Sequence, residues 1–217
     1  MEGRIIMSEK LVAQEQKMSE VESFSPDDYL INIIRRAVKN SQNIHISIEG
    51  QGNIILQATD GEYFDHTDDI ESFCKNKASK FKVTVLAKKT GNVTSDDVGR
   101  NIDELMWLVG FYVSNGRLMQ GCYRDDVVEL MHWPNLTRLP STPNTMRLAS
   151  LLSSHPTSIT LAQRFLKVDH SEIYQFYTAA RCAGLIRAVN RTPEEPKLKP
   201  HRNQALLGLL LNKIAGI

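Results

Sequence analysis

The segment from His170 to Arg181 carries polar side chains at a spacing that suits recognition of a macromolecule. Glutamine can form paired hydrogen bonds with adenine, threonine and histidine can contact a phosphate or a base edge, and glutamate can accept from cytosine. Because the segment has helical periodicity, we expect these side chains to be exposed along one helix face. The candidate contact residues of this face are His170, Glu172, Gln175, Thr178 and Arg181.

Basic residues cluster after this segment rather than within it. Arg181 is the only permanent cation between residues 170 and 182, and DNA binding depends on several neutralised phosphates. A basic loop can bind in the minor groove of DNA. In the basic loop from Arg187 to Arg202, however, Glu194 and Glu195 interrupt the run of positive charges. The pattern therefore favours a protein partner, with DNA as the alternative. The further candidate contacts are Arg187, Arg191, Lys197, Lys199 and Arg202.

Catalytic and metal-binding patterns are missing from the sequence. The six histidines include no HxxxH or HExxH pair, and no phosphate-binding glycine loop or GxSxG motif occurs. The run FDHTDD could bind a divalent cation, but it fits a solvated loop and a helix cap better. We expect no enzyme activity, no cofactor and no metal site.

Composition and charge limit the class of protein. The 217 residues are 41% hydrophobic and 24% charged, as in globular proteins. No apolar run reaches the roughly 18–20 residues that span a bilayer, and the first residues lack the apolar stretch of a signal peptide. The three cysteines lie far apart, which suits buried thiols in a reducing compartment. We therefore expect a cytoplasmic protein that does not enter the membrane.

The charge distribution divides the chain into two parts. Residues 1–132 carry 15 Lys and Arg against 21 Asp and Glu, a net charge of −6, whereas residues 133–217 carry 11 against 4, a net charge of +7. We expect four segments along the chain. They are a flexible lead-in at 1–25, an α+β module at 26–90, a connecting helix and proline-punctuated segment at 91–143, and a further unit at 144–217.

Periodicity predicts the elements of the first module. Ser25 is placed to cap a helix that starts at Pro26, and the alternating isoleucines of NIHISIEG predict a half-buried strand. A second strand, with a turn at Asp60-Gly61, is expected in NIILQATDGEYF. A short helix capped by Thr67 or Asp68 is expected in DHTDDIESFCKNKA, and a third strand in SKFKVTVLA. The expected order is α-β-β-α-β, and the expected fold class is α+β, with a mainly helical second half.

Three helices and a strand are expected between residues 144 and 190. The helices are NTMRLASLLSSHP, SITLAQRFLKV and DHSEIYQFYTAARCAG, and the strand is LIRAV. We expect core positions in the second helix at Ile159, Leu161, Ala162, Phe165 and Leu166, and in the third at Ile173, Phe176, Tyr177 and Ala180.

This order is that of a helix-turn-helix followed by a wing. Residues 144–190 resemble the winged-helix family at Leu161-Ala162, at Val168 in the turn, at Ile173, and at Gly184-Leu185-Ile186 entering the wing. The resemblance implies a compact three-helix unit that binds either DNA or protein.

The last segment, NQALLGLLLNKIAGI, predicts a helix that is apolar around most of its circumference. Such a helix must be buried, either between the two halves of its own chain or at an interface with a second copy or a partner. The candidate interface residues are Leu206, Leu207, Leu210 and Ile214.

These patterns favour a non-enzymatic bacterial regulatory or signalling protein that acts by protein–protein interaction, either with a partner or as a dimer. A DNA-binding transcriptional regulator is the alternative. A small-ligand or nucleotide-responsive adaptor is the second alternative. Arg35-Arg36 followed by HISIEG resembles part of the cyclic-dinucleotide-binding PilZ pattern, with His45 where that pattern has an acid or amide.

Overall fold

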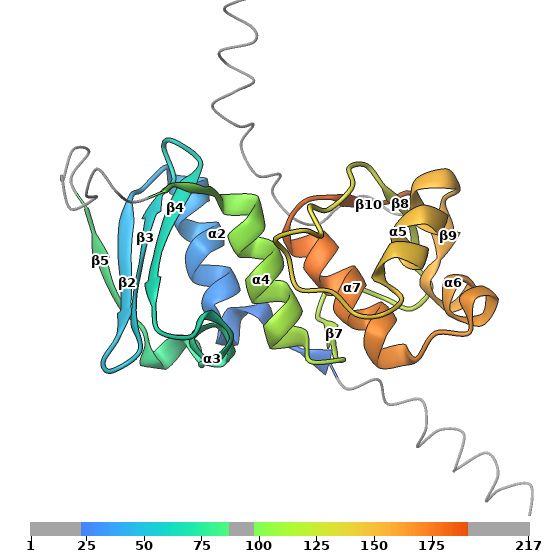
Figure 1. Ribbon diagram of the computed structural model, residues 1–217, viewed down its shortest axis with the longest axis horizontal. Coiled ribbons are helices and arrows are strands. Elements are labelled where there is room, and N and C mark those ends of the chain that lie inside the picture. Colours follow the sequence, from blue (N-terminus) through green and yellow to red (C-terminus); the bar gives the residue numbers. More distant parts are fainter. Residues whose placement is uncertain (1–22, 87–97, 191–217) are drawn as a thin grey trace, which may run out of the picture.

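The computed structural model describes residues 23–86 and 98–190. It confirms the α+β class: a five-stranded sheet with helices on one face forms one end, and a helical unit with a small sheet forms the other (Figure 1). One hydrophobic core extends through both halves, from Phe24 to Ala188. The expected lead-in up to residue 22 and the expected C-terminal helix lie outside the described residues.

The large sheet is antiparallel throughout, in the order β5-β2-β3-β4-β6. In register, Ile44 lies beside Leu56 and Ile46 beside Ile54, and all four side chains are buried. This confirms the half-buried strand expected in NIHISIEG. The strands are β2 (Ile44–Ile48), β3 (Gly52–Gln57), β4 (Glu62–Thr67), β5 (Lys82–Val85) and β6 (Arg100–Asn101).

The region expected to hold one strand with a turn holds two strands. β3 and β4 pair along their whole length, so the observed order is α-β-β-β-α-β and the expected order lacks one strand. The chain reverses at Asp60-Gly61, where Gly61 has a φ of 75° and donates its N–H to the Gln57 carbonyl at 2.9 Å. Only glycine adopts this left-handed conformation without steric cost.

Three helices lie on one face of the sheet: α2 (Leu30–Asn40), α3 (Ile70–Lys75) and α4 (Ile102–Ser114) (Figure 1). The helix expected from Pro26 begins as a separate 3₁₀ turn, η1 (Pro26–Asp28), which Ser25 caps, so that α2 starts only at Leu30. A second 3₁₀ turn, η2 (Ala78–Lys80), precedes β5. Asp69 caps α3 in place of the expected Thr67 or Asp68, because its carboxylate accepts from two N–H groups of the first turn.

Helix α4 joins the two halves. It packs against α2 and α3 on one side and against α7 (His170–Cys182) on the other, so every residue from Leu105 to Phe111 is buried (Figure 1). Trp107 meets Phe176 edge to face at 5.9 Å between ring centres and donates its indole N–H to the Pro140 carbonyl at 3.0 Å. The expected connecting helix is therefore a shared core element.

The start of this helix differs from the expectation. The spacing of Val98, Ile102, Leu105, Met106 and Val109 in the sequence predicts one apolar stripe, but Val98 precedes α4 and is 79% exposed. Asn101 is the N-cap, and its side-chain oxygen accepts from the Asp103 N–H at 2.8 Å. The cap fixes the first helical residue at Ile102, four residues after the valine.

The C-terminal unit has the expected order of helix, helix, turn, helix and strand. Its elements are α5 (Thr145–Ser154), β9 (Thr157–Ser158), α6 (Ile159–Leu166), α7 and β10 (Ile186–Ala188). The middle strand of its three-stranded antiparallel sheet is β8 (Val127–Leu130), which pairs with β10 on one side and β9 on the other. The unit thus includes chain that precedes residue 144. A short parallel pair, β1 (Ser23–Phe24) and β7 (Leu118–Met119), joins the first described residues to the segment after α4.

Candidate docking surface

Helix α7, which we expect to present contact residues, is largely enclosed. Thr178 is 0% exposed and Arg181 8% exposed, so the prediction that both are exposed is wrong. The reason is tertiary: α7 packs against α4 on one side and against α5 and α6 elsewhere. The core positions expected on the same helix are confirmed, since Ile173, Phe176 and Tyr177 are all buried.

The remaining candidate residues of α7 mostly have partners inside the fold. Gln175 donates its Nε2 to the Phe111 carbonyl of α4 at 3.1 Å. Glu172 accepts from the backbone N–H and the side-chain Nδ2 of Asn144, at 3.2 and 3.1 Å. Of the five candidates on this helix, His170 alone is classed as exposed. The polar face therefore holds α7 against α4 and α5.

A buried polar pair fixes α7 to the loop before β8. Asp126, which is 2% exposed, accepts from the Tyr177 hydroxyl at 2.5 Å and from the Tyr123 N–H at 2.8 Å. Burial raises the pKa of Tyr177, so its hydroxyl stays protonated and donates to the carboxylate. Hydrogen bonds to an ionised group are stronger than neutral ones, and this bond orients α7 within the core.

The described candidate cations differ in their surroundings. Arg187 on β10 is exposed and pairs with Glu129 of β8, with 2.7 Å between Nη2 and Oε2. Arg164 and Lys167 are exposed at α6, whereas Arg181 is buried in α7. The other candidate residues lie outside the described part of the chain. They are Arg191, Lys197, Lys199 and Arg202 of the basic set, and Leu206, Leu207, Leu210 and Ile214 of the interface set.

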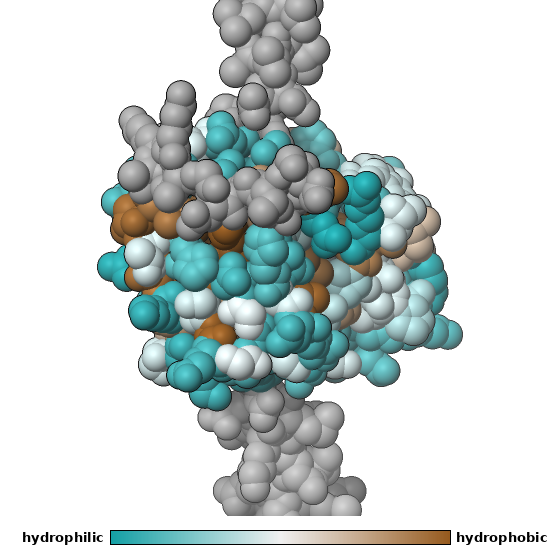
Figure 2. Space-filling model, turned by 60° about the vertical axis from the view of Figure 1, so that its left-hand side comes forward, coloured by the Kyte–Doolittle hydropathy of each residue, from teal (hydrophilic) through white to brown (hydrophobic). Residues whose placement is uncertain are grey.

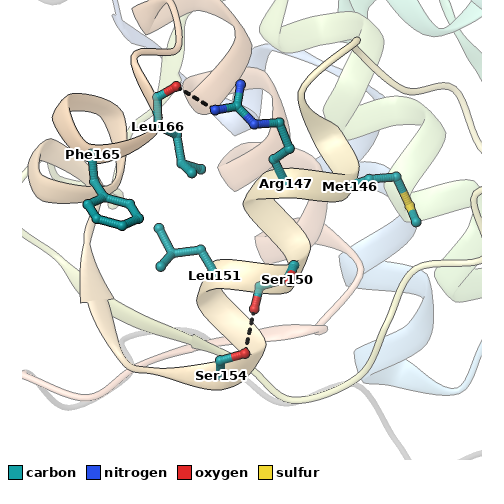
Figure 3. A pocket seen from close by; sticks show the side chains of 7 residues that line it. All are labelled: Met146, Arg147, Ser150, Leu151, Ser154, Phe165 and Leu166. Atoms are coloured by element: carbon teal, nitrogen blue, oxygen red, sulfur yellow. Dashed lines mark hydrogen bonds between the residues drawn. The ribbon is translucent and has the colours of Figure 1, made fainter.

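An apolar groove lies between α5 and α6. Phe165 and Leu161, which we expect in the core, are 71% and 57% exposed, so this prediction is wrong; α6 buries only Ile159 and Ala162. The side chains of Phe165, Leu166 and Leu151 point toward one another across the groove (Figure 3). Its volume is about 480 Å³. It is lined by Met146, Arg147, Ser150, Leu151, Ser154, Phe165 and Leu166.

Hydrogen bonds hold the two walls of the groove in place. Arg147 of α5 donates one guanidinium nitrogen to the Leu166 carbonyl at 3.0 Å and the other to Asn144 Oδ1 at 2.6 Å. Ser158 caps α6, and its hydroxyl accepts from the Leu161 N–H at 3.1 Å. The groove therefore offers carbon surface with a few polar groups at its rim, which suits a row of apolar side chains.

Arg35, the first residue of the PilZ-like pattern, faces the interior of the fold. Its Nη2 lies 3.8 Å from Met119 Sδ and 3.9 Å from Cys182 Sγ, between α2 and α7. A ligand-binding arginine would need an open approach from solvent. These contacts engage Arg35 within the fold, whereas Arg36, the second arginine of the pattern, is exposed.

The outer face of the large sheet is mainly hydrophilic, with separate hydrophobic patches (Figure 2). At its edge, Val83 and Val85 of β5 are 43% and 62% exposed. Both share the helix-covered face of the sheet with Ile46 and Ile44, their partners in register. Their exposure shows that the helix layer stops short of this edge strand.

The FDHTDD run serves local structure. Asp65 accepts from the N–H and the hydroxyl of Thr67 at 3.0 and 2.7 Å, and Asp69 caps α3. Within residues 23–86 and 98–190, no three His, Cys, Asp or Glu side chains gather as a metal site would require. Over the same ranges, no helix has the length and apolarity to cross a membrane. All three cysteines are buried thiols outside any disulfide.

Comparison of the chain with known protein families, with curated proteins and with solved structures finds no match.

Proposed function

We propose that the protein is a non-enzymatic regulatory protein of the bacterial cytoplasm that binds another polypeptide through the groove between α5 and α6. One observation carries the proposal. The helix that a DNA-reading winged-helix protein presents, α7, is enclosed by α4, while large apolar side chains of α5 and α6 are exposed. Three buried thiols outside any disulfide support a reducing compartment.

The groove suits a partner helix with apolar residues on one face. In this binding mode, side chains three or four residues apart fill a hydrophobic groove. Met146 is 58% exposed and Phe165 71% exposed. Covering a large apolar side chain completely contributes about 1.5–3 kcal/mol. Because the hydrogen bond from Arg147 to the Leu166 carbonyl already joins α5 to α6, little ordering of the groove would oppose binding.

DNA binding is the second candidate function, and the exposed cations near the groove favour it. Arg147, Arg164 and Lys167 are exposed on α5 and α6 or directly after α6. Exposed cations of this kind can contact phosphates, and they can equally pair with acidic residues at the rim of a partner helix. The dependence of affinity on salt concentration distinguishes DNA binding from binding of a partner helix, because a protein that binds DNA releases counterions from the phosphates.

The test is a titration of a labelled random DNA duplex with the full chain, followed by fluorescence anisotropy. A protein that neutralises six to ten phosphates loses about 10³–10⁵ in affinity between about 50 and 200 mM salt. We expect no such binding at the lower salt concentration. Tight binding at the lower salt concentration would reject the proposal in favour of the DNA-binding alternative, and its loss on replacing Lys197, Lys199 and Arg202 together by alanine would assign the contact to those residues.

A second measurement tests the protein interface directly. A photo-crosslinking side chain is placed at Phe165 in the full chain inside cells, and in a matched variant at Val83 on β5. Both positions are exposed and apolar, but β5, the strand that carries Val83, lies at the other end of the molecule from α5 and α6 (Figure 1). We expect a discrete adduct with another polypeptide from Phe165 and none from Val83. Equal labelling at the two positions would contradict the proposed surface.

A further inference from the structure

We infer that the α5–α6 groove binds the chain's own C-terminal segment, residues 204–217, until a partner displaces it. In this arrangement Leu206, Leu210 and Ile214 face Phe165 and Leu151. The inference rests on the proposed function, because both require the groove to accept an apolar helix. It names the segment that occupies the groove, and it proposes that this segment and a partner compete for the same surface.

The position between the two halves is already filled. The sequence indicates the space between the two halves as one place where the apolar C-terminal segment could be buried. There, Trp107 and Leu105 are 0% exposed, and Phe176 is 1% exposed. At Gly110 the helices are so close that a Cβ would lie 3.0 Å from the Ala179 Cα. No space for a further helix remains between α4 and α7, so the segment must cover apolar surface elsewhere.

The described chain ends in the same unit as the groove. The Asn190 side chain accepts from the Val127 N–H at 3.0 Å and donates to the Asp125 carbonyl at 2.9 Å. Val127 pairs with Ser158, the cap of α6. From there α6 rises about 12 Å to Leu166, so the groove lies roughly 20 Å from Asn190. By contrast, β5, the strand that carries Val83 and Val85, lies at the opposite end of the molecule from β10 (Figure 1).

The intervening sequence is long enough, and the segment has a matching apolar stripe. Residues 191–203 can span up to about 40 Å when extended. In the segment, Leu206, Leu210 and Ile214 recur every fourth residue, with Leu207 beside them, a spacing that would place them on one face of a helix. A helix of residues 204–217 would be about 21 Å long, comparable with the roughly 15 Å of α5.

A disulfide trap in the full chain tests the occupant. Cysteines replace Phe165 and Leu210 in one variant, and Arg164 and Leu210 in the control; Arg164 is exposed on α6 but does not line the groove. The natural cysteines are buried, so they compete little. Under oxidised glutathione we expect an intramolecular disulfide to form about tenfold faster in the Phe165 variant, because docking raises the effective concentration of the pair. Non-reducing electrophoresis separates intramolecular from intermolecular products.

Hydrogen exchange of the full chain gives an independent readout. We expect Leu206→Asp/Leu210→Asp to raise amide exchange in α5 and α6 about tenfold and to leave α2 unchanged. Asn212→Asp is the control, since it places a charge on the opposite face of the segment. We expect this variant to exchange as the wild type does.

Two outcomes overturn the inference. One is equal trapping rates in the two cysteine variants, together with unchanged exchange in α5 and α6. The other is a mainly intermolecular disulfide, which assigns the groove to a second copy of the chain. A failure of the proposed function is distinguishable from both. If the segment docks but the full chain also binds random duplex tightly at low salt, the inference stands and the proposed function falls.

Discussion

Replacing Gly110 by valine should force apart the two helices that unite the protein. A Cβ at this position would lie 3.0 Å from the Ala179 Cα and 3.0 Å from the Cys182 Cβ and Sγ. Carbon atoms prefer about 3.5–4.0 Å, so α4 and α7 must separate. Overpacking costs about 1–3 kcal/mol, and the better helix propensity of valine offsets only about 0.4 kcal/mol. We expect the free energy of unfolding to fall by about 2 kcal/mol.

The assay is urea unfolding of the full chain, followed both by tryptophan fluorescence and by far-ultraviolet circular dichroism. With a denaturant slope of about 2 kcal/mol per M, the midpoint should fall by about 1 M. Because α4 belongs to a core shared by both halves, the two signals should change together in one transition.

A double-mutant cycle identifies α7 as the element that Gly110 contacts. Cys182→Ala removes the Sγ that would meet the new side chain, so Gly110→Val should cost at least about 0.5 kcal/mol less in that background. An unchanged midpoint, an equal cost in both backgrounds, or two separate transitions would show that α7 is not held tightly on α4. The main argument against DNA reading by α7 would then fail.

Three further predictions concern other contacts. Tyr177→Phe should lower the free energy of unfolding by about 1.5–3 kcal/mol in the same assay, because Asp126 loses a buried donor; a loss below about 0.5 kcal/mol would contradict this. Burial raises the pKa of Tyr63 to about 12 from 10.0, so the folded state keeps a proton that the unfolded chain releases. The free energy of unfolding should therefore fall between pH 10 and about 12, by up to about 2–3 kcal/mol. In parallel urea titrations, Tyr63→Phe should lack this part of the pH-dependent fall. Ser158→Ala should cost about 1 kcal/mol by removing the cap of α6, whereas Ser158→Asp should retain most of it; equal losses in both would show that the cap contributes nothing.

Local patterns in the sequence were sufficient for most elements of the fold. Alternating isoleucines predicted β2, and the spacing of Ile173, Phe176 and Tyr177 predicted the buried stripe of α7. Each of these depends on one face of one element, which periodicity reports directly. The expected order lacks β4 because its residues are divided between two expected elements: EYF ends the predicted second strand, and DHT begins the predicted short helix.

The exposed surface could not be predicted in the same way, because it depends on neighbours distant in sequence. Thr178 and Arg181 lie away from the first apolar stripe of α7, so they read as solvent-facing until the elements that pack around α7 are in place. Phe165 reads as core because it is apolar, yet α6 is only eight residues long and is bounded by Ser158 and the left-handed Lys167. So short a helix contributes few positions to the core.

A signal for the enclosed α7 was nevertheless present in α4. The run LMWLVGF is apolar around the whole helix, and a helix of that kind must be covered on more than one side. The large sheet and its helices can cover only one side, so a second partner had to come from the C-terminal half. Gly110 in α4 and Ala179-Ala180 in α7 are small residues, which let two helices approach closely. Once α4 takes α7 as that partner, α7 is covered by its own chain, and the proposed binding surface therefore lies on α5 and α6.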